Sequence, residues 1–306
     1  MKNIAIFGAT GFIGKALTQY LLDKNLKVTA ITRNKDKARQ TLDERTEVFQ
    51  WDYNNVLKLS ELLAQTDVII NLAGANIASR LWTQKHKQKI LSSRINAGKK
   101  ITEAVKHAKH KPELMIQGSA IGYYGYDTQG ECNEKSPKGD GFLAEVTDQW
   151  EKSTREIESM GVRRVIIRTG MVLGNSGGIF PRLKKPIQWF AGANLGSGKQ
   201  WFSWIHLTDE IRAIEYLINH HQMAGIFNLT APFPVSSKTF NQTVAKLLNR
   251  PIWLSIPKFL FALIPGNMGI EVFLASQQVI PSHLQASGFK FTYPRLTEAV
   301  NHLVKN

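Results

Sequence analysis

The stretch that decides the fold stands at the start of the chain and reads Lys2-Asn3-Ile4-Ala5-Ile6-Phe7-Gly8-Ala9-Thr10-Gly11-Phe12-Ile13-Gly14. Its apolar first half, residues 2–7, predicts a short buried strand. Apolar residues then recur at helical spacing through residues 11–23, which predicts an amphipathic helix directly after a glycine-rich turn. A strand, a glycine turn and a helix in immediate succession are typical of the first unit of a parallel α/β sheet.

The three glycines of this turn each have a physical task in a dinucleotide site. Gly8 permits a tight turn out of the strand, Gly11 lets the backbone approach a pyrophosphate, and Gly14 allows the helix to pack closely on the strand. The free N–H groups and the dipole of the helix N-terminus attract phosphate. A purely structural glycine turn is the alternative. The residues assigned to the cofactor here are Gly8, Thr10, Gly11, Phe12, Ile13 and Gly14.

The rest of the first half continues the alternation of strands and helices. Strands are predicted over residues 28–32, 47–51, 68–72, 114–119 and 165–168, and helices over 84–108 and 142–160. This pattern predicts a Rossmann-type, doubly wound parallel sheet. Glycine and proline become frequent after residue 169. We therefore expect an NADP-binding Rossmann domain over residues 1–170, and a smaller C-terminal α+β substrate lobe over residues 171–306, interleaved with the main sheet.

The end of the second predicted strand bears on the choice of cofactor. A site that prefers NAD(H) places an acid there to bind the ribose 2′-hydroxyl, whereas this chain has Arg33. A guanidinium can bind a 2′-phosphate through two parallel hydrogen bonds, so NADP(H) is favoured over NAD(H). The alternative is that Arg33 belongs to a surface turn. Asp52, after the third strand, either accepts from the adenine amino group or forms an ordinary turn.

Small residues follow two further strands. Leu72, Ala73 and Gly74 end the fourth strand, and Gly118 lies near the end of the fifth. Side chains this small let a cofactor lie against the backbone at the carboxyl edge of the sheet. These four residues complete the predicted cofactor site.

As a set, these residues resemble the extended short-chain dehydrogenases/reductases, the nucleoside-diphosphate-sugar epimerase superfamily. The segments that carry the resemblance are residues 8–14, 71–74, 119–125, 168–170 and 196–206. The last four are similar to one branch, whose members are called epimerase family proteins or NAD(P)-dependent epimerase-like oxidoreductases. The resemblance covers essentially the whole chain and implies an α/β nucleotide-binding fold.

The chain departs from this superfamily at the catalytic helix. The superfamily uses a Ser or Thr and a Tyr-x-x-x-Lys pair, in which tyrosinate takes a proton and lysine lowers the pKa of the tyrosine. The corresponding positions here are Leu143 and Thr147, or Phe142 and Val146, and none of these side chains does that chemistry. Alignment at the Tyr-Gly pair also places Ala120 where the catalytic Ser or Thr would stand. The standard mechanism is therefore not predicted.

Other polar groups are candidates for catalysis. Tyr123 and Tyr124 follow the fifth strand and are candidate proton donors, with Ser119 orienting a carbonyl; both tyrosines could equally be packing residues. His206 ends an aromatic segment, where an imidazole either acts as acid or base, or bonds Asp209 and caps a helix.

Substrate binding is predicted for residues that suit an anion or a ring. Arg94, Arg168 and Lys199 could hold an anionic group, and Trp204 could stack on a sugar or another flat ring. Ion pairs to nearby carboxylates and a place in the core are the structural alternatives. No metal site is predicted. A small-molecule substrate, anionic or a sugar nucleotide, follows as the expected partner.

The net charge of +15 is concentrated between residues 85 and 111, where nine Lys or Arg residues stand against one acid, Glu103. We interpret this run as the solvated face of a long helix, because no nucleic-acid-binding signature accompanies it. A nucleic-acid partner is therefore not favoured. A single cysteine, Cys132, and the lack of a stretch long enough to span a bilayer predict a cytoplasmic protein with no membrane partner. By analogy with other proteins of this fold, the chain is expected to be able to form a homodimer.

Two functional hypotheses follow. The first is an NADP-dependent oxidoreductase or epimerase with a non-standard proton donor. The second is a catalytically silent regulatory protein that binds NADP(H), and the missing Tyr-x-x-x-Lys pair is its motivation.

Overall fold

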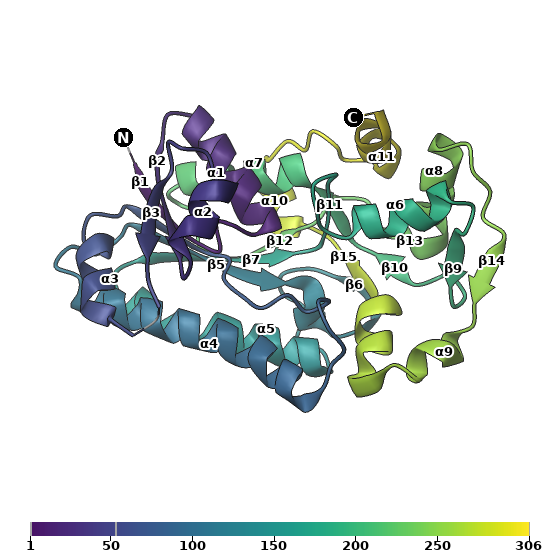
Figure 1. Ribbon diagram of the computed structural model, residues 1–306, viewed down its shortest axis with the longest axis horizontal. Coiled ribbons are helices and arrows are strands. Elements are labelled where there is room, and N and C mark those ends of the chain that lie inside the picture. Colours follow the sequence, from purple (N-terminus) through teal and green to yellow (C-terminus); the bar gives the residue numbers. More distant parts are fainter. Residues whose placement is uncertain (1, 53, 306) are drawn as a thin grey trace.

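A seven-stranded parallel sheet forms the centre of the computed structural model, which describes residues 2–52 and 54–305 (Figure 1). Its strand order is β12-β7-β5-β4-β1-β2-β3, with β1 in the middle and β4 and β2 on either side of it. The strands are β1 (Asn3–Phe7), β2 (Lys27–Thr32), β3 (Glu47–Gln50), β4 (Val68–Asn71), β5 (Leu114–Ala120), β7 (Arg163–Thr169) and β12 (Gly225–Leu229). The order reverses beside β1, which confirms the predicted doubly wound fold.

Helices cover both faces of this sheet, because successive strand residues point to opposite sides. Ile4 and Ile6 of β1 pack with one set of helices, and Ala5 and Phe7 pack with the other. The first set is α1 (Phe12–Asp23), α2 (Lys35–Thr41), α7 (Leu207–Asn219) and α10 (Ser282–Ala286). The second set is α3 (Val56–Leu63) and α4 (Gln84–His107). Burial on both faces explains why the strands are apolar throughout.

The segment after β5 leads toward the C-terminal lobe. A 3₁₀ turn, η1 (Ile121–Tyr124), is followed by β6 (Asp127–Cys132), which pairs with β15 (Ser276–Val279) from near the end of the chain. Helix α5 (Phe142–Lys152) then packs beside η1 and α4. The β6–β15 pair thus joins the lobe to the edge of the sheet where β5 ends.

The lobe has its own small core, in which Phe180, Trp204 and Phe240 are buried together. The sheet strand β12 lies within this part of the sequence, so the chain returns to the main sheet and leaves it again. The remaining strands are β8 (Met171–Leu173), β9 (Ala193–Leu195), β10 (Trp201–Phe202), β11 (Trp204–His206), β13 (Val235–Ser236) and β14 (Leu254–Ile256). The remaining helical elements are α6 (Phe180–Gln188), α8 (Ser237–Leu247), α9 (Lys258–Ala262), η3 (Pro265–Asn267), η4 (Gly269–Phe273) and α11 (Leu296–Lys305).

One predicted helix is wrong in its extent. The helix predicted over residues 142–160 is α5 followed by a separate 3₁₀ helix, η2 (Arg155–Met160). The helix stops where Ser153 packs against Gly98 of α4, at a contact so close that a Cβ on Gly98 would lie 1.9 Å from the Ser153 Oγ. The aromatic segment 201–206 forms two short strands with different partners, since β10 pairs with β13 and β11 pairs with β8, and the Ser203 hydroxyl between them bonds the backbone of β15.

The basic run of residues 85–111 forms α4 and the turn that follows it. Of its nine basic residues, Lys100 pairs with Glu103, Lys106 with Glu156, and Lys111 donates to two backbone carbonyls. Among the helices in the described part of the chain, none has the length and apolar character required to cross a membrane.

Candidate functional site

The glycine turn between β1 and α1 is shaped by close backbone approaches. Gly8 has a φ of +84°, and a Cβ there would lie 2.8 Å from the Leu72 backbone. A Cβ on Gly14 would lie 2.2 Å from the Gly8 carbonyl oxygen. Helix α1 begins after Gly11, and no side chain of the described residues caps it. Its first N–H groups are therefore open to a phosphate, and the residues present fit a dinucleotide.

The other predicted cofactor residues lie along the same edge of the sheet. Arg33 is exposed immediately after β2, and its backbone carbonyl accepts from the side chain of Gln50, the last residue of β3. Asp52 accepts from the backbone and side chain of Asn54, so it forms a turn, and these bonds lower the pKa of its carboxyl. The Leu72 amide donates to Phe7 at the end of β1.

A cavity of about 850 Å³ opens beside this edge, where β5 and β7 end. It brings together four of the predicted residues, Phe12, Ile13, Arg94 and Ser119. Its other walls come from α5, from the segment after β8 and from the C-terminal lobe, which contributes Glu271 and Gln277. A Cβ on Gly74 would lie 2.8 Å from the Arg94 guanidinium carbon, so Gly74 is in close contact with that side chain.

The positions of the missing Tyr-x-x-x-Lys pair face this cavity. Of the two candidate pairs, Leu143 and Thr147 of α5 both line it, whereas of Phe142 and Val146 only Val146 does. The Thr147 hydroxyl donates to backbone carbonyls of its own helix. The α5 N-terminus is capped by Glu271, whose carboxylate accepts from the Leu143 amide.

Behind Ser119 lies a buried polar network. The Arg168 guanidinium forms a two-bond pair with Glu151, at 2.8 Å and 2.9 Å, and the Ser119 hydroxyl donates to the same carboxylate at 2.6 Å. Burial alone would lower the pKa of Arg168, but its bonds to Glu151 raise it overall, so it stays charged. Arg168 does not line the cavity, and its charge is already paired.

The two tyrosines pack on this network outside the cavity. The Arg168 guanidinium carbon lies 3.3 Å from the centre of the Tyr123 ring. The Tyr124 hydroxyl donates to the Asn228 side chain at 2.7 Å and accepts from Arg168. Burial raises the pKa of Tyr124 to about 12, although Arg168 acts in the opposite direction. Neither ring lines the cavity described above.

Three further predicted residues lie away from this cavity. His206 caps α7, because its Nδ1 accepts from the Thr208 amide, and its Nε2 lies 3.2 Å from a His302 nitrogen. Burial and His302 lower the pKa of His206 to about 4, so the ring is neutral near pH 7. Trp204 is fully buried in the core of the lobe. Lys199 is exposed in the turn between β9 and β10.

Two residues beside the cavity were missed by sequence reasoning. Thr169 ends β7 and lines the cavity, and its hydroxyl donates to Glu210 of α7 at 2.8 Å. Glu210 is wholly buried, and its second oxygen has no partner among the described residues. Burial raises the pKa of Glu210 to about 8, against the lowering effect of Thr169. The signal was present in the sequence, since Glu210 precedes Ile214 and Leu217 on the apolar face of α7.

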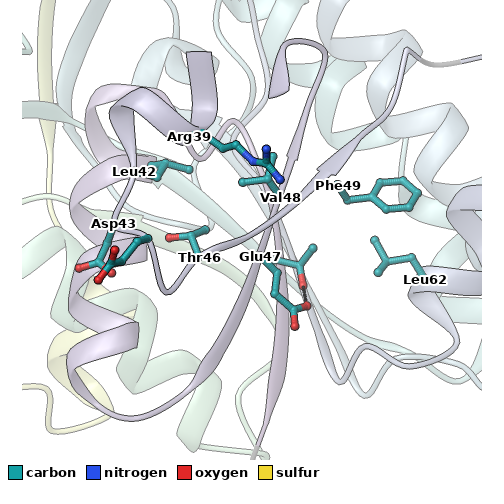
Figure 2. Close-up of a pocket in the computed structure, with 10 residues that line it drawn as sticks. Arg39, Leu42, Asp43, Thr46, Glu47, Val48, Phe49 and Leu62 are labelled. Carbon is teal, nitrogen blue, oxygen red and sulfur yellow. Dashed lines mark hydrogen bonds between the residues drawn. The ribbon is translucent and has the colours of Figure 1, made fainter. Parts of the chain in front are cut away.

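A second hollow, of about 620 Å³, lies at the edge strand β3 (Figure 2). Arg39 and Asp43 border it on one side, and Glu47, which accepts from Thr29, borders it on the other. It lies where β3 begins, whereas ligands of open α/β sheets bind where the strands end. We assign no function to it.

A doubly wound parallel sheet with an open, glycine-lined helix N-terminus at its carboxyl edge defines a Rossmann-type nucleotide-binding protein. Within that class, the chain belongs to the NAD dependent epimerase/dehydratase family, whose profile matches residues 4–230. A domain of unknown function, DUF1731, matches residues 256–303. The family resemblance drawn from the sequence is confirmed.

Known relatives match the chain along its whole length. Epimerase family protein SSP1921 of Staphylococcus saprophyticus is 39% identical and covers 99% of this chain and 100% of its own. Epimerase family protein YfhF of Bacillus subtilis is also 39% identical, over 99% of this chain and 98% of its own. A crystal structure of human epimerase family protein SDR39U1 with NADPH superposes with a TM-score of 0.85, at 27% identity and 99% coverage of both chains.

A nucleoside-diphosphate sugar epimerase of Corynebacterium glutamicum is a further structural relative. It superposes with a TM-score of 0.78 at 30% identity, over 99% of this chain and 58% of the relative. UDP-glucuronic acid 4-epimerase of Bacillus cereus has a TM-score of 0.80 at 20% identity, and that likeness concerns the fold alone.

Proposed function

We propose that this chain is an NADP(H)-dependent oxidoreductase or epimerase that holds a small anionic substrate in the cavity beside Arg94. The proposal rests on the Arg94 side chain, whose guanidinium has hydrogen-bond partners but no anionic one among the described residues. Its guanidinium donates only to the carbonyls of Ala75 and Ile90, each at 3.0 Å, and none of the ion pairs found in the described residues includes it. A partly buried cation with only carbonyl partners is stabilised by a neighbouring anion.

Arg94 is also held in place by its surroundings. Its guanidinium carbon lies 4.9 Å from the centre of the Trp150 ring, and Gly74 leaves room for it on another side. Burial lowers the pKa of Arg94 to about 10, so the side chain still carries its charge at neutral pH. A sugar nucleotide is one substrate that meets this requirement, and the name of the Corynebacterium relative agrees with it.

The preference for NADP(H) rests on Arg33. Its side chain is exposed beside the carboxyl end of β2, and no ion pair in the described part of the chain includes it, so it is free to bind a 2′-phosphate. The NADPH in the human relative's structure supports the same choice. The lone cysteine supports a place in the reducing cytoplasm.

The proton is proposed to come from Glu210 through Thr169. When bound, the nicotinamide ring supplies or takes up the hydride. Glu210 holds a proton near pH 7, and the Thr169 hydroxyl connects it to the cavity. In the reducing direction, the hydrogen bond between these two residues reverses: protonated Glu210 donates to the Thr169 hydroxyl oxygen as that hydroxyl passes its own proton to the substrate oxygen, which leaves Glu210 ionised. Ser119 directs its hydroxyl proton to Glu151, so its oxygen is left to accept from a substrate hydroxyl in the cavity.

An activity screen with three variants tests this proposal. We expect a panel of anionic carbonyl and sugar-nucleotide substrates to include one that changes absorbance at the reduced nicotinamide band. Arg94→Met should raise the KM of that substrate by about 10- to 100-fold while NADPH binding is kept, because a hydrogen bond to a charged group contributes about 1.5–3 kcal/mol. Lys99→Met, at an exposed position of the same helix, is the matched control. Thr169→Val should lower kcat.

The regulatory alternative is favoured by one observation, the presence of Leu143 and Thr147 where the catalytic pair would face the cavity. It predicts tight NADPH binding, no turnover of any substrate in the panel, and a set of bound proteins that changes with NADPH. Turnover that Thr169→Val abolishes would exclude it. A protein that binds neither dinucleotide would contradict both functions.

A further inference from the structure

The end of the C-terminal lobe farthest from α3 carries large exposed apolar side chains. These come from three segments, the end of α6, strand β14 and helix α9, which lie together at one end of the molecule (Figure 1). We define this apolar end by the six residues Trp189, Phe190, Trp253, Leu254, Phe259 and Leu263. The exposed fractions reach 82% for Trp189 and 74% for Trp253 and Leu263. Clustered exposure of this kind marks an interaction surface.

Direct contacts hold the three segments beside one another. Strands β9 and β14 pair in parallel, so Ala193 lies opposite Leu254. The Arg250 side chain bonds the Gln188 carbonyl and lies 4.5 Å from the centre of the Phe190 ring, which joins the end of α6 to the approach to β14. Helix α9 begins two residues after β14 ends. The side chains of the apolar end therefore come from adjoining segments of the lobe.

The segments that carry the apolar end contain basic residues and no acidic ones. No Asp or Glu occurs between residues 159 and 208 or between residues 216 and 270, which contain all three segments. Charged residues close to it along the chain are Lys184 and Lys185 on α6, Lys246 near the end of α8, Arg250 three residues after α8, and Lys258 at the start of α9. A second copy of the same surface would bring these like charges together, which disfavours self-association.

We infer that the apolar end binds the surface of an anionic lipid bilayer. Tryptophan and phenylalanine partition into the headgroup region, and lysine and arginine around them are attracted to anionic headgroups. The sequence predicted no membrane partner because no stretch is long enough to span a bilayer, and this surface binds without spanning. None of the six residues of the apolar end lines the cavity with Arg94 and Ser119. Membrane binding therefore does not depend on the proposed reaction.

Sedimentation with vesicles tests this inference on the full chain. We expect the protein to pellet with phosphatidylcholine vesicles that contain about 30 mol% phosphatidylglycerol, and not with pure phosphatidylcholine. Binding should fall steeply in about 1 M salt, where the Debye length is about 3 Å. The fluorescence of Trp189 and Trp253 should shift to shorter wavelength, since most other described tryptophans are already buried.

Two variants distinguish binding through this surface from non-specific adsorption to vesicles. Trp253→Ser combined with Phe259→Ser should lower the vesicle partition coefficient by about ten-fold or more, because each change removes a large apolar side chain whose transfer out of water favours binding. Leu57→Ser removes an equally exposed apolar residue from α3, at the opposite end of the molecule, and should leave binding unchanged. The inference is overturned by equal binding to both vesicle types, by no binding, or by equal loss in Leu57→Ser. A wild-type dimer that the double variant converts to a monomer, without vesicle binding, would assign the surface to self-association instead.

Discussion

Replacing Glu210 with glutamine should stabilise the protein, and the gain should grow as the pH rises. Glu210 is wholly buried on α7, with Thr169 as its hydrogen-bond donor and no partner for its second oxygen among the described residues. Burial raises the pKa of its carboxyl from 4.5 to about 8. Glutamine has nearly the same shape as the protonated acid, and its carbonyl still accepts from Thr169.

The sign and size follow from proton linkage. Between about pH 4.5 and 8 the unfolded chain releases the Glu210 proton while the folded protein keeps it. The free energy of unfolding of the wild type therefore falls as the pH rises. Each pKa unit corresponds to about 1.4 kcal/mol. At about pH 7 the difference between Glu210→Gln and the wild type should therefore be about 3 kcal/mol larger than at about pH 4.5.

Urea unfolding of both proteins at several pH values measures this difference. Glu61→Gln is the matched control, because Glu61 is exposed on α3, and it should follow the wild type at every pH. If the free energies of unfolding of Glu210→Gln and the wild type stay parallel from pH 5 to about pH 8, Glu210 is ionised in the folded protein. The proposed proton source would then fail as well.

Three further changes test the site. Arg33→Asp should weaken NADPH binding by about 10- to 100-fold and leave NADH binding little changed, as followed by a fluorescence titration; equal losses for both would refute the assignment of the 2′-phosphate. Arg168→Met leaves the Glu151 carboxylate buried without its cation, so it should lower the free energy of unfolding by about 3–5 kcal/mol in urea. Gly14→Ala places a Cβ against the Gly8 turn and should abolish dinucleotide binding, whereas Gly130→Ala, with open space around it, should bind as the wild type does.

The sequence alone determined the fold of the sheet and the place of the glycine turn. The strands through Ile4, Ile69 and Ile116 are apolar on both faces, and the order of strands and helices leaves few ways to cover them. Such patterns are local: they depend on residues close together in the chain. The family follows from the same segments, because their motifs are short and continuous.

The tertiary structure alone decided which polar side chains face the cavity. Ser119 and Arg94 line it, whereas Tyr124 turns to Asn228 and His206 turns to His302, each about one hundred residues away in the chain. The sequence reveals the chemistry of a side chain, but its direction and its pKa depend on distant neighbours and on the water they exclude. Glu210 is the clearest case. Its carboxyl is charged in the unfolded chain near neutral pH, and it keeps its proton only when the packed sheet and lobe enclose it.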